Sequence, residues 1–340
     1  MPRLLWCSLF VMALLGCQGE DGKPEKPQAG SGALTGAAPS GNKKLRIAVI
    51  PKGTTHEFWK SVHAGAQNAA TELGDVEIQW KSQQLEDDRE GQISVVQDFI
   101  SKKMDGIVLA PLDSQALVPY VQEAKQAGIP VVIFDSGLND QETPISYVAT
   151  DNKNGGAVAA RHLAKLLENK GNVILTRYNQ GSESTGLREE GFLETLEKEF
   201  PDIKVLSSNV YIGTTPEKSL DQCQSLLIKF GKEVHGVFCV CEPNTTGMLR
   251  ALEQENLVGK VKFIGFDPAP QLLEAMRAKK LHGIVIQDPV KIGYEGVKAV
   301  VDHIRGKETS KRIVTGEYLA TPENMDSPEM KTLLSPQQHD

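Results

Sequence analysis

The chain has 340 residues, of which 40% are hydrophobic and 24% are charged, and its formal charge at pH 7 is −7. This length exceeds what one hydrophobic core usually serves, so it favours two domains. The acidic balance, with no run of basic residues, argues against a general nucleic-acid-binding surface.

The first residues have the features of a targeting segment. Arg3 precedes an apolar stretch of 13 residues, LLWCSLFVMALLG, which is too short to cross a bilayer as a mature helix and is typical of a signal peptide. The stretch ends in LLGC, which resembles the bacterial lipobox, where the cysteine becomes the lipidated first residue. We therefore predict a lipoprotein signal peptide over 1–16 and a lipid on Cys17. Ordinary signal cleavage, with Cys17 a bystander, is the alternative.

The composition of the segment after the signal peptide predicts a tether, and the spacing of the remaining cysteines bears on metal binding and disulfides. Residues 17–44 are rich in Gly, Pro, Ser and Lys without periodicity, so after Cys17 we expect a flexible tether with a reach of about 30 Å. The remaining cysteines, Cys223, Cys239 and Cys241, have no spacing typical of a metal site. We expect buried free thiols, although a bridge from Cys223 to either of the others is an open alternative.

From residue 45 onward, short apolar runs alternate with amphipathic segments. The runs predict strands at 45–50, 76–80, 106–111, 129–134, 145–150, 172–176, 203–210, 236–240, 260–266 and 282–287. The amphipathic segments predict helices near 56–73, 87–103, 115–127, 152–168, 185–199, 216–230, 244–256, 269–279 and 289–305. This alternation indicates an α/β fold with parallel sheets covered by helices on both faces. One sheet of ten strands would be large, so we predict two sheets of about five, one per domain.

Each half of the pattern places a Phe-Asp pair at the end of a buried strand, with Asp135 in IPVVIFD and Asp267 in VKFIGFD. A single aspartate there is usually a turn or helix-cap residue, and Asp267 precedes Pro268 as a cap residue would. Ligands of open α/β sheets bind off the carboxyl ends of the strands. Because the pair recurs at matching places, we expect both carboxylates to face one cleft, where each can accept two neighbouring sugar hydroxyls.

Other candidates come from strand ends and helix starts. Arg188 opens a helix after a Gly/Ser-rich loop, and Gln287 ends the strand GIVIQ. In PKGTTHEFW, the T-x-x-E pattern from Thr54 predicts a capping box. Phe58 and Trp59 follow it, and taken alone they are either core residues or one wall of a binding site.

In this order, IAVIPKGTTHEFW, IPVVIFDSG, ISYVATDN, LREEGF, GVFCVCEPNTTGMLRAL, FIGFDPAP and GIVIQDPVKIGYEGVKAVV resemble the periplasmic ribose/galactose-type sugar-binding proteins. These share their fold with the effector domain of lac-repressor-type regulators. The resemblance implies a type I periplasmic binding protein, with two Rossmann-like doubly wound parallel-sheet lobes joined by a three-strand hinge. The implied boundaries are 45–150 plus 288–314 for the N-terminal lobe, 151–287 plus 315–326 for the C-terminal lobe, and 327–340 for a tail.

The resemblance also implies roles for single residues. The positions that match the family's stacking aromatics, carboxylates, arginine and hinge-side amide are Phe58, Trp59, Asp135, Asp267, Arg188 and Gln287. The departures are His56, where ribose binders have asparagine, Ser136, where they have arginine, and the pair Cys241-Glu242, where Asn-Asp is usual. We include these four in the expected ligand site. Tyr211 is the nearest choice for a second-lobe aromatic.

We therefore expect a lipid-anchored solute-binding protein of an ABC-type importer. It would bind a monosaccharide or related polyol, act as a monomer in the periplasm or cell envelope, dock on an ABC permease, and contact the membrane only through its lipid. No cofactor, metal, nucleic acid or catalysis is expected, since the sequence has no G-x-S-x-G, HExxH or GxGxxG after the first strand. A non-sugar ligand or a sensor partner is the alternative. A glycoside-processing enzyme is less favoured, and a transcription regulator would need a DNA-binding motif ahead of Leu45.

Overall fold

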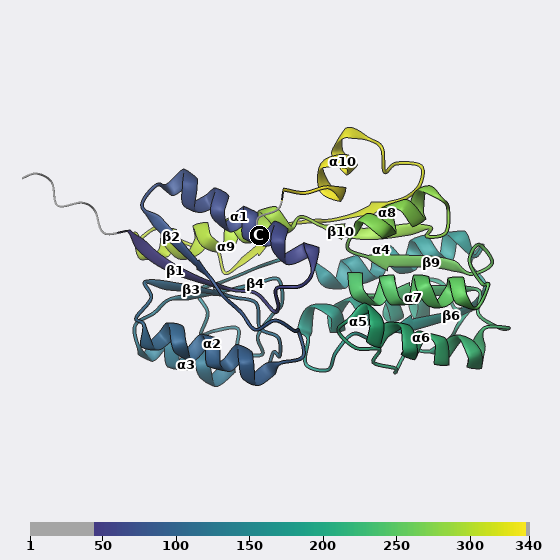
Figure 1. Ribbon diagram of the computed structural model, residues 1–340, viewed down its shortest axis with the longest axis horizontal. Coiled ribbons are helices and arrows are strands. Elements are labelled where there is room, and N and C mark those ends of the chain that lie inside the picture. Colours follow the sequence, from purple (N-terminus) through teal and green to yellow (C-terminus); the bar gives the residue numbers. More distant parts are fainter. Residues whose placement is uncertain (1–43, 338–340) are drawn as a thin grey trace, which may run out of the picture. The chain divides into compact units, whose positions relative to one another are not determined.

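The computed structural model describes residues 44–337 (Figure 1). The predictions of a signal peptide, a lipid on Cys17 and a tether fall outside these residues.

Two six-stranded sheets organise the described chain. The first has the order β11-β5-β4-β3-β1-β2 and the second β12-β10-β9-β8-β6-β7. Neighbouring strands are parallel except β12, which runs antiparallel to β10. The strands are β1 (Leu45–Ile50), β2 (Val76–Trp80), β3 (Gly106–Leu109), β4 (Val131–Phe134), β5 (Ser146–Ala149), β6 (Gly171–Thr176), β7 (Ile203–Ser207), β8 (Gly236–Cys239), β9 (Lys262–Phe266), β10 (Gly283–Gln287), β11 (Arg312–Val314) and β12 (Glu317–Ala320).

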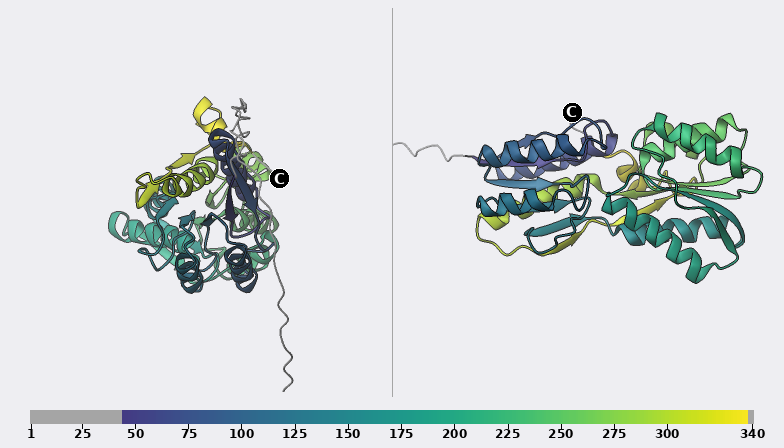
Figure 2. Two further views of the ribbon diagram at one scale, coloured as in Figure 1. Left: turned by 90° about the vertical axis from the view of Figure 1, so that its left-hand side faces the viewer. Right: turned by 90° about the horizontal axis from the view of Figure 1, so that it is seen from below.

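Helices cover both faces of each sheet (Figure 2). In the N-terminal lobe, α1 and α9 pack on one face, and α2 and α3 pack on the other. In the C-terminal lobe, α4 and α5 cover one face, and α6, α7, α8 and α10 cover the other. The helices are α1 (Glu57–Leu73), α2 (Arg89–Ser101), α3 (Val118–Gln126), α4 (Asn152–Leu166), α5 (Glu183–Glu199), α6 (Pro216–Phe230), α7 (Glu242–Gln254), α8 (Pro270–Arg277), α9 (Pro289–Ile304) and α10 (Pro328–Leu334). The predicted fold class is confirmed.

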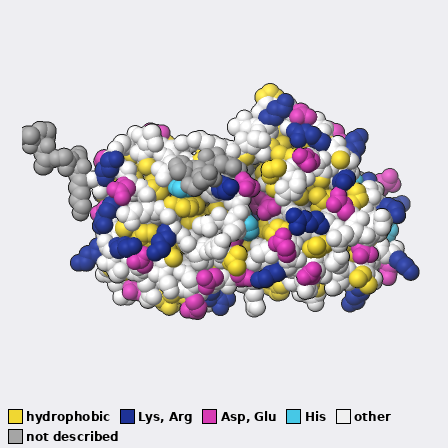
Figure 3. All heavy atoms as spheres, viewed as in Figure 1, with side chains coloured by type: hydrophobic (Ala, Val, Ile, Leu, Met, Phe, Trp, Pro, Cys, Tyr) yellow, Lys and Arg dark blue, Asp and Glu magenta, His cyan; other side chains and the backbone are white. Residues whose placement is uncertain are grey.

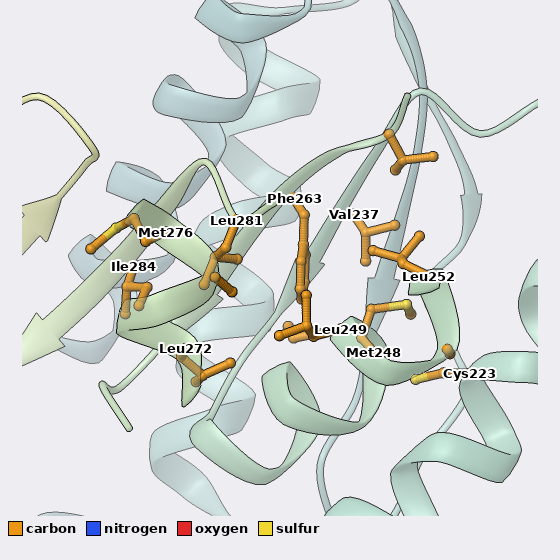
Figure 4. Packing of buried hydrophobic residues seen from close by; sticks show 14 of the residues in the cluster. Cys223, Val237, Met248, Leu249, Leu252, Phe263, Leu272, Met276, Leu281 and Ile284 are labelled. Carbon is orange, nitrogen blue, oxygen red and sulfur yellow. The ribbon is translucent and has the colours of Figure 1, made fainter. Parts of the chain in front are cut away.

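The central strands are apolar along their whole length because both of their faces are buried. Successive side chains point to opposite faces, so Val237 and Phe263 enter the core beneath α6, α7 and α8 (Figure 4). Phe238 and Ile264, the next residues on the same strands, enter the core beneath α4 and α5. Burial on both faces explains why these strands could be recognised as continuous apolar runs.

The chain crosses between the lobes three times, after β5, after β10, and between β11 and β12. The last two strands were missed in the sequence because they are short and lie at the sheet edges, with few buried side chains. Helix α10 was also missed. It lies within the expected tail, yet it buries Met330 and Leu334 in the core of the C-terminal lobe.

Glycines set a close helix crossing in each lobe. At the α4–α5 crossing, a Cβ on Gly191 would overlap the backbone oxygen of Lys153, and a Cβ on Gly156 would overlap that of Arg188. The α1–α9 crossing has the same arrangement, with Gly65 and Gly293 against the facing backbone. In the C-terminal lobe, this close approach fixes the part of α5 that carries Arg188.

Two helix starts differ from the sequence predictions. Helix α1 begins at Glu57 after His56, whose side chain makes no capping hydrogen bond, so the expected capping box at Thr54 is wrong. Helix α8 begins at Pro270 after Ala269. Asp267 is therefore not the N-terminal cap of that helix, and its carboxylate can serve another role.

The surface shown in Figure 3 carries basic and acidic side chains interspersed across both halves, without one large basic patch on that face. Within residues 44–337, no helix has the length and hydrophobicity needed to cross a membrane.

Candidate functional site

The two lobes enclose a small polar cavity at the carboxyl ends of their strands. Its walls come from the loops and helix starts that follow β1, β2, β4, β6, β8 and β9, together with the end of β10. The lining residues are Lys52, His56, Phe58, Trp59, Glu86, Asp135, Tyr178, Ser184, Thr185, Arg188, Cys241, Glu242, Pro243, Asp267 and Gln287. The volume of this cavity is about 40 Å³.

Asp135 and Asp267 reach this cavity by the same local geometry. Each follows a fully buried phenylalanine that ends a strand, and each has φ of 62°. The N–H of Asp135 donates to the carbonyl of Val148 and the N–H of Asp267 to that of Val285, both at 2.9 Å. These bonds tie each aspartate to the neighbouring strand and hold its backbone in the left-handed region, which aspartate tolerates better than most residues.

Glu86 connects both lobes at one side of the cavity. Its carboxylate accepts hydrogen bonds from the Trp59 indole (2.7 Å) and, from the other lobe, the Tyr178 hydroxyl (2.8 Å). His56 Nδ1 lies 2.6 Å from the same carboxylate. Burial disfavours the charged imidazole, but the adjacent Glu86 outweighs burial and raises the pKa of His56 to about 9. Likewise, burial opposes ionisation of Glu86, but His56 and Lys52 lower its pKa to about 2.

Lys52 forms a second link between the lobes. Its ammonium lies 3.4 Å from Asp135 and donates across the cleft to the hydroxyls of Ser182 (3.2 Å) and Ser184 (3.0 Å). The side chain is almost fully buried. A buried ammonium needs such partners, so Lys52 fixes both the carboxylate and the start of α5.

Arg188 and Gln287 hold the second aspartate. The Arg188 guanidinium lies 3.6 Å from Asp267, donates to Asn152 (2.9 Å) and stacks 3.7 Å from the ring centre of Phe266. The Gln287 amide donates to Asp267 (2.9 Å), and its oxygen accepts from Thr150 (2.6 Å). Burial raises the pKa of Asp267 to about 6, although Arg188 and Gln287 oppose the shift.

The two aromatic residues at the start of α1, Phe58 and Trp59, have different roles. Trp59 is 3% exposed and packs edge-on against Phe58 and Phe134. It therefore belongs to the core, and one side also lines the cavity. Phe58 is half-buried and separates the cavity from a larger adjoining hollow of about 450 Å³, which Asp267 and Gln287 also line. The segment PKGTTHEFW thus supplies both a core residue and part of the cavity wall.

Nine of the ten residues expected in the ligand site line this cavity. The exception is Ser136, which is fully buried behind the wall and accepts a hydrogen bond from the N–H of Ser184 in the other lobe (3.1 Å). The suggestion of Tyr211 as the second-lobe aromatic is wrong, because its side chain is 44% exposed and lies against Arg177. Tyr178 lines the cavity instead.

The residues missed in the sequence are Lys52, Glu86, Tyr178, Ser184, Thr185 and Pro243. Lys52 and Tyr178 come two residues after a strand, so the strand-end rule that identified Asp135 could have found them. Glu86 gave no such signal, because it lies six residues beyond β2 in an irregular loop.

The cysteines of the described chain are free and buried, and Cys241 lines the cavity. Burial raises the pKa of all three thiols, which keeps them protonated and poorly nucleophilic. Among residues 44–337, no group of three histidine, cysteine or acidic side chains is placed to hold a metal ion.

Comparisons with known proteins agree with this architecture. A family model described as the periplasmic binding protein domain matches residues 47–308. The chain belongs to this periplasmic binding protein family. The resemblance noted in the sequence is thereby confirmed, and membership implies a location in the periplasm or cell envelope.

Three individual proteins illustrate the similarity. The ribose import binding protein RbsB of Bacillus subtilis is 29% identical over 81% of this chain and 87% of its own. A carbohydrate transporter solute-binding protein from Agrobacterium radiobacter, solved with D-arabinose, has a TM-score of 0.82 at 30% identity, covering 86% of this chain and 99% of that one. An ABC transporter solute-binding protein from Agrobacterium vitis, solved with D-fucose, has a TM-score of 0.82 at 31% identity, covering 85% and 100%. These relatives are transport proteins that bind ligands, which agrees with the expectation that the chain is not an enzyme.

Proposed function

We propose that this periplasmic binding protein captures a monosaccharide or related polyol for an ABC-type importer. The observation that carries the proposal is the matched pair Asp135 and Asp267, which reach one interlobe cavity from equivalent strand ends. The names of the relatives, which include proteins for ribose import, D-arabinose and D-fucose, support a ligand of this class.

The chemistry of the cavity suits neighbouring hydroxyl groups. Ionised carboxylates only accept hydrogen bonds, whereas the guanidinium of Arg188 only donates, and Gln287 can do both. A sugar hydroxyl donates one hydrogen bond and accepts others, so it can lie between these groups. Phe58 and Trp59 offer flat apolar surfaces to the C–H faces of a ring.

We infer that the ligand enters when the lobes separate at the three crossovers and is enclosed when they close. Bonds between the lobes, such as Tyr178 to Glu86 and Lys52 to Ser184, would stabilise the closed form.

That closed form would then dock on the ABC permease as a monomer. Light scattering during gel filtration tests the monomer, and a species of twice the expected mass would contradict it.

Isothermal titration calorimetry of the purified protein tests the ligand class. Pentoses, hexoses and polyols form the panel, with amino acids and short peptides as controls. Saturable binding of at least one sugar or polyol, lost in Asp135→Ala, supports the proposal. Binding of a control compound in their place would contradict it.

We also propose that Cys17 carries a lipid and that residues 18–44 serve as a tether. The sequence LLGC after an apolar stretch supports this part of the proposal. Cells fed an alkyne-tagged fatty acid should label the wild-type protein, and Cys17→Ser should lose the label. Label retained in that variant would contradict the anchor.

A further inference from the structure

The cavity is lined by more acidic than basic side chains. Among its lining residues are three basic and four acidic side chains. Three of the carboxylates lie within 4 Å of a basic nitrogen, in the pairs Asp135–Lys52, Glu86–His56 and Asp267–Arg188. The fourth, Glu242, has no ion-pair partner within that distance anywhere in residues 44–337.

Glu242 is the first residue of α7, and within residues 44–337 the one short hydrogen bond of its side chain is local. One carboxylate oxygen accepts a hydrogen bond from the Thr246 hydroxyl at 2.8 Å, and the amide of Gln271 lies 3.5 Å from the same oxygen. No described residue bonds to its second oxygen. The N-terminal end of α7 gives the charge partial support.

The basic residue of the cavity that attracts Glu242 does not neutralise its charge. His56 attracts Glu242, but its Nδ1 is already committed to Glu86 at 2.6 Å. Glu86 and Glu57 repel the charge, and burial raises the pKa of the Glu242 carboxyl. Glu242 is half-buried, and a carboxylate that is partly removed from water without an ion-pair partner loses solvation that nothing replaces. A ligand that brings a positive charge to this position would therefore gain more than a neutral one.

We propose that the ligand is an amino sugar or amino polyol whose protonated amine pairs with Glu242. The inference rests on the proposed function and specifies its ligand class. An ammonium supplies three donors and removes the excess negative charge of the cavity. The remaining hydroxyls then lie between Asp135, Asp267 and their basic partners.

Calorimetry at pH 7 with matched ligands tests this directly. The pairs differ only in –NH₃⁺ against –OH: glucosamine and glucose, galactosamine and galactose, mannosamine and mannose. The N-acetyl forms, in which the amine is a neutral amide, serve as uncharged controls. A charged hydrogen bond should make at least one amino sugar bind about tenfold or more tightly than its hydroxyl counterpart, and N-acetylation should remove that gain.

The variant Glu242→Gln keeps the shape and the Thr246 contact but removes the charge. It should lose the preference for the amine while binding the hydroxyl counterpart within about threefold of wild type. Glu274→Gln, which neutralises a carboxylate lining only the adjoining hollow, should keep the preference. Circular dichroism establishes that both variants are folded.

The outcomes separate the two proposals. Wild type that binds neutral sugars as tightly as their amino counterparts overturns the amino-ligand inference and leaves the proposed function standing, whatever the variant does. A preference that persists in Glu242→Gln also overturns it. If no compound of either kind binds, and no pentose, hexose or polyol of the wider panel binds either, the proposed function itself fails.

Discussion

Asp135 and Asp267 are equivalent residues of the two lobes: both follow a buried phenylalanine at the end of a strand, and both adopt φ of 62°. Their basic partners differ, since Lys52 lies against the first and Arg188 against the second. Two similar lobes therefore present the same acceptor to one cavity, and each lobe holds it with its own cation.

This backbone geometry predicts how Asp135 tolerates substitution. Asn accepts the left-handed conformation, whereas a β-branched residue is strained there by about 1–2 kcal/mol. Asp135→Val should therefore unfold at lower denaturant than Asp135→Asn, although both lack the charge that pairs with Lys52. Urea denaturation of the two variants measures the difference, and equal free energies of unfolding would contradict the backbone argument.

Asp135 and Asp267 were predictable from the sequence. A strand that is buried on both faces appears as a continuous apolar run, and the residue that follows it lies at the carboxyl edge of the sheet. Gln287 was predictable as the last residue of such a strand, and Arg188 as part of a helix start after a Gly/Ser-rich loop. Glu86 did not, because only the folded loop brings it beneath His56 and Tyr178. Tyr211 was the nearest choice for a second-lobe aromatic, although Tyr178, two residues after β6, follows a strand end more closely.

The two edge strands were not predicted from the sequence, for a related reason. Strands β11 and β12 are held by pairing to β5 and β10, so their own side chains carry little hydrophobic signal. The capping-box prediction at Thr54 failed because the loop continues to His56, where the imidazole is used by Glu86 and not by the helix end.

The pair of His56 and Glu86 predicts a pH dependence of stability. The pKa of His56 rises from 6.5 to about 9 on folding, so its contribution is complete below pH 6.5 and is lost as the pH rises through 9. The corresponding free energy is about 3 kcal/mol at most. Glu86, with a pKa of about 2, contributes above pH 4.5 and loses its contribution as the pH falls through 2.

The variant His56→Gln isolates this effect. The difference in unfolding free energy between wild type and variant should shrink between pH 6.5 and 9.5. The Asp267 carboxyl, whose pKa burial raises to about 6, titrates in both proteins and cancels from this difference. Urea titrations at pH 6, 7, 8 and 9.5 provide the measurement. A difference that stays constant over this range would show that folding does not raise the pKa of His56.

The α4–α5 crossing predicts a steric effect at Gly191. Alanine there would overlap the carbonyl oxygen of Lys153, so Gly191→Ala should lower the free energy of unfolding by about 1–3 kcal/mol. Gly186 lies on the same helix with no atom within 4 Å of an added Cβ. Gly186→Ala should be neutral or stabilising by up to about 1 kcal/mol. Thermal unfolding compares the two, and similar losses would refute the crossing argument.

The contacts between the lobes predict unequal effects on ligand affinity. Lys52→Met removes a buried cation that joins Asp135 to Ser184, so it should weaken binding at least about tenfold. Lys218→Met removes an exposed pair with Asp87 on the cleft rim, which should cost about fivefold or less. Calorimetry with the best ligand measures both, and a larger effect from Lys218 would place the decisive contact at the rim.

The central claim is that sugars or polyols bind between Asp135 and Asp267, and thermal unfolding against a ligand panel tests it most directly. At about 100 times its dissociation constant, a ligand should add about 2.7 kcal/mol to the stability of the native protein. We predict a rise in Tm with at least one sugar or polyol and none with Asp267→Ala. A rise only with non-sugar compounds, or one that persists in Asp267→Ala, would contradict the account.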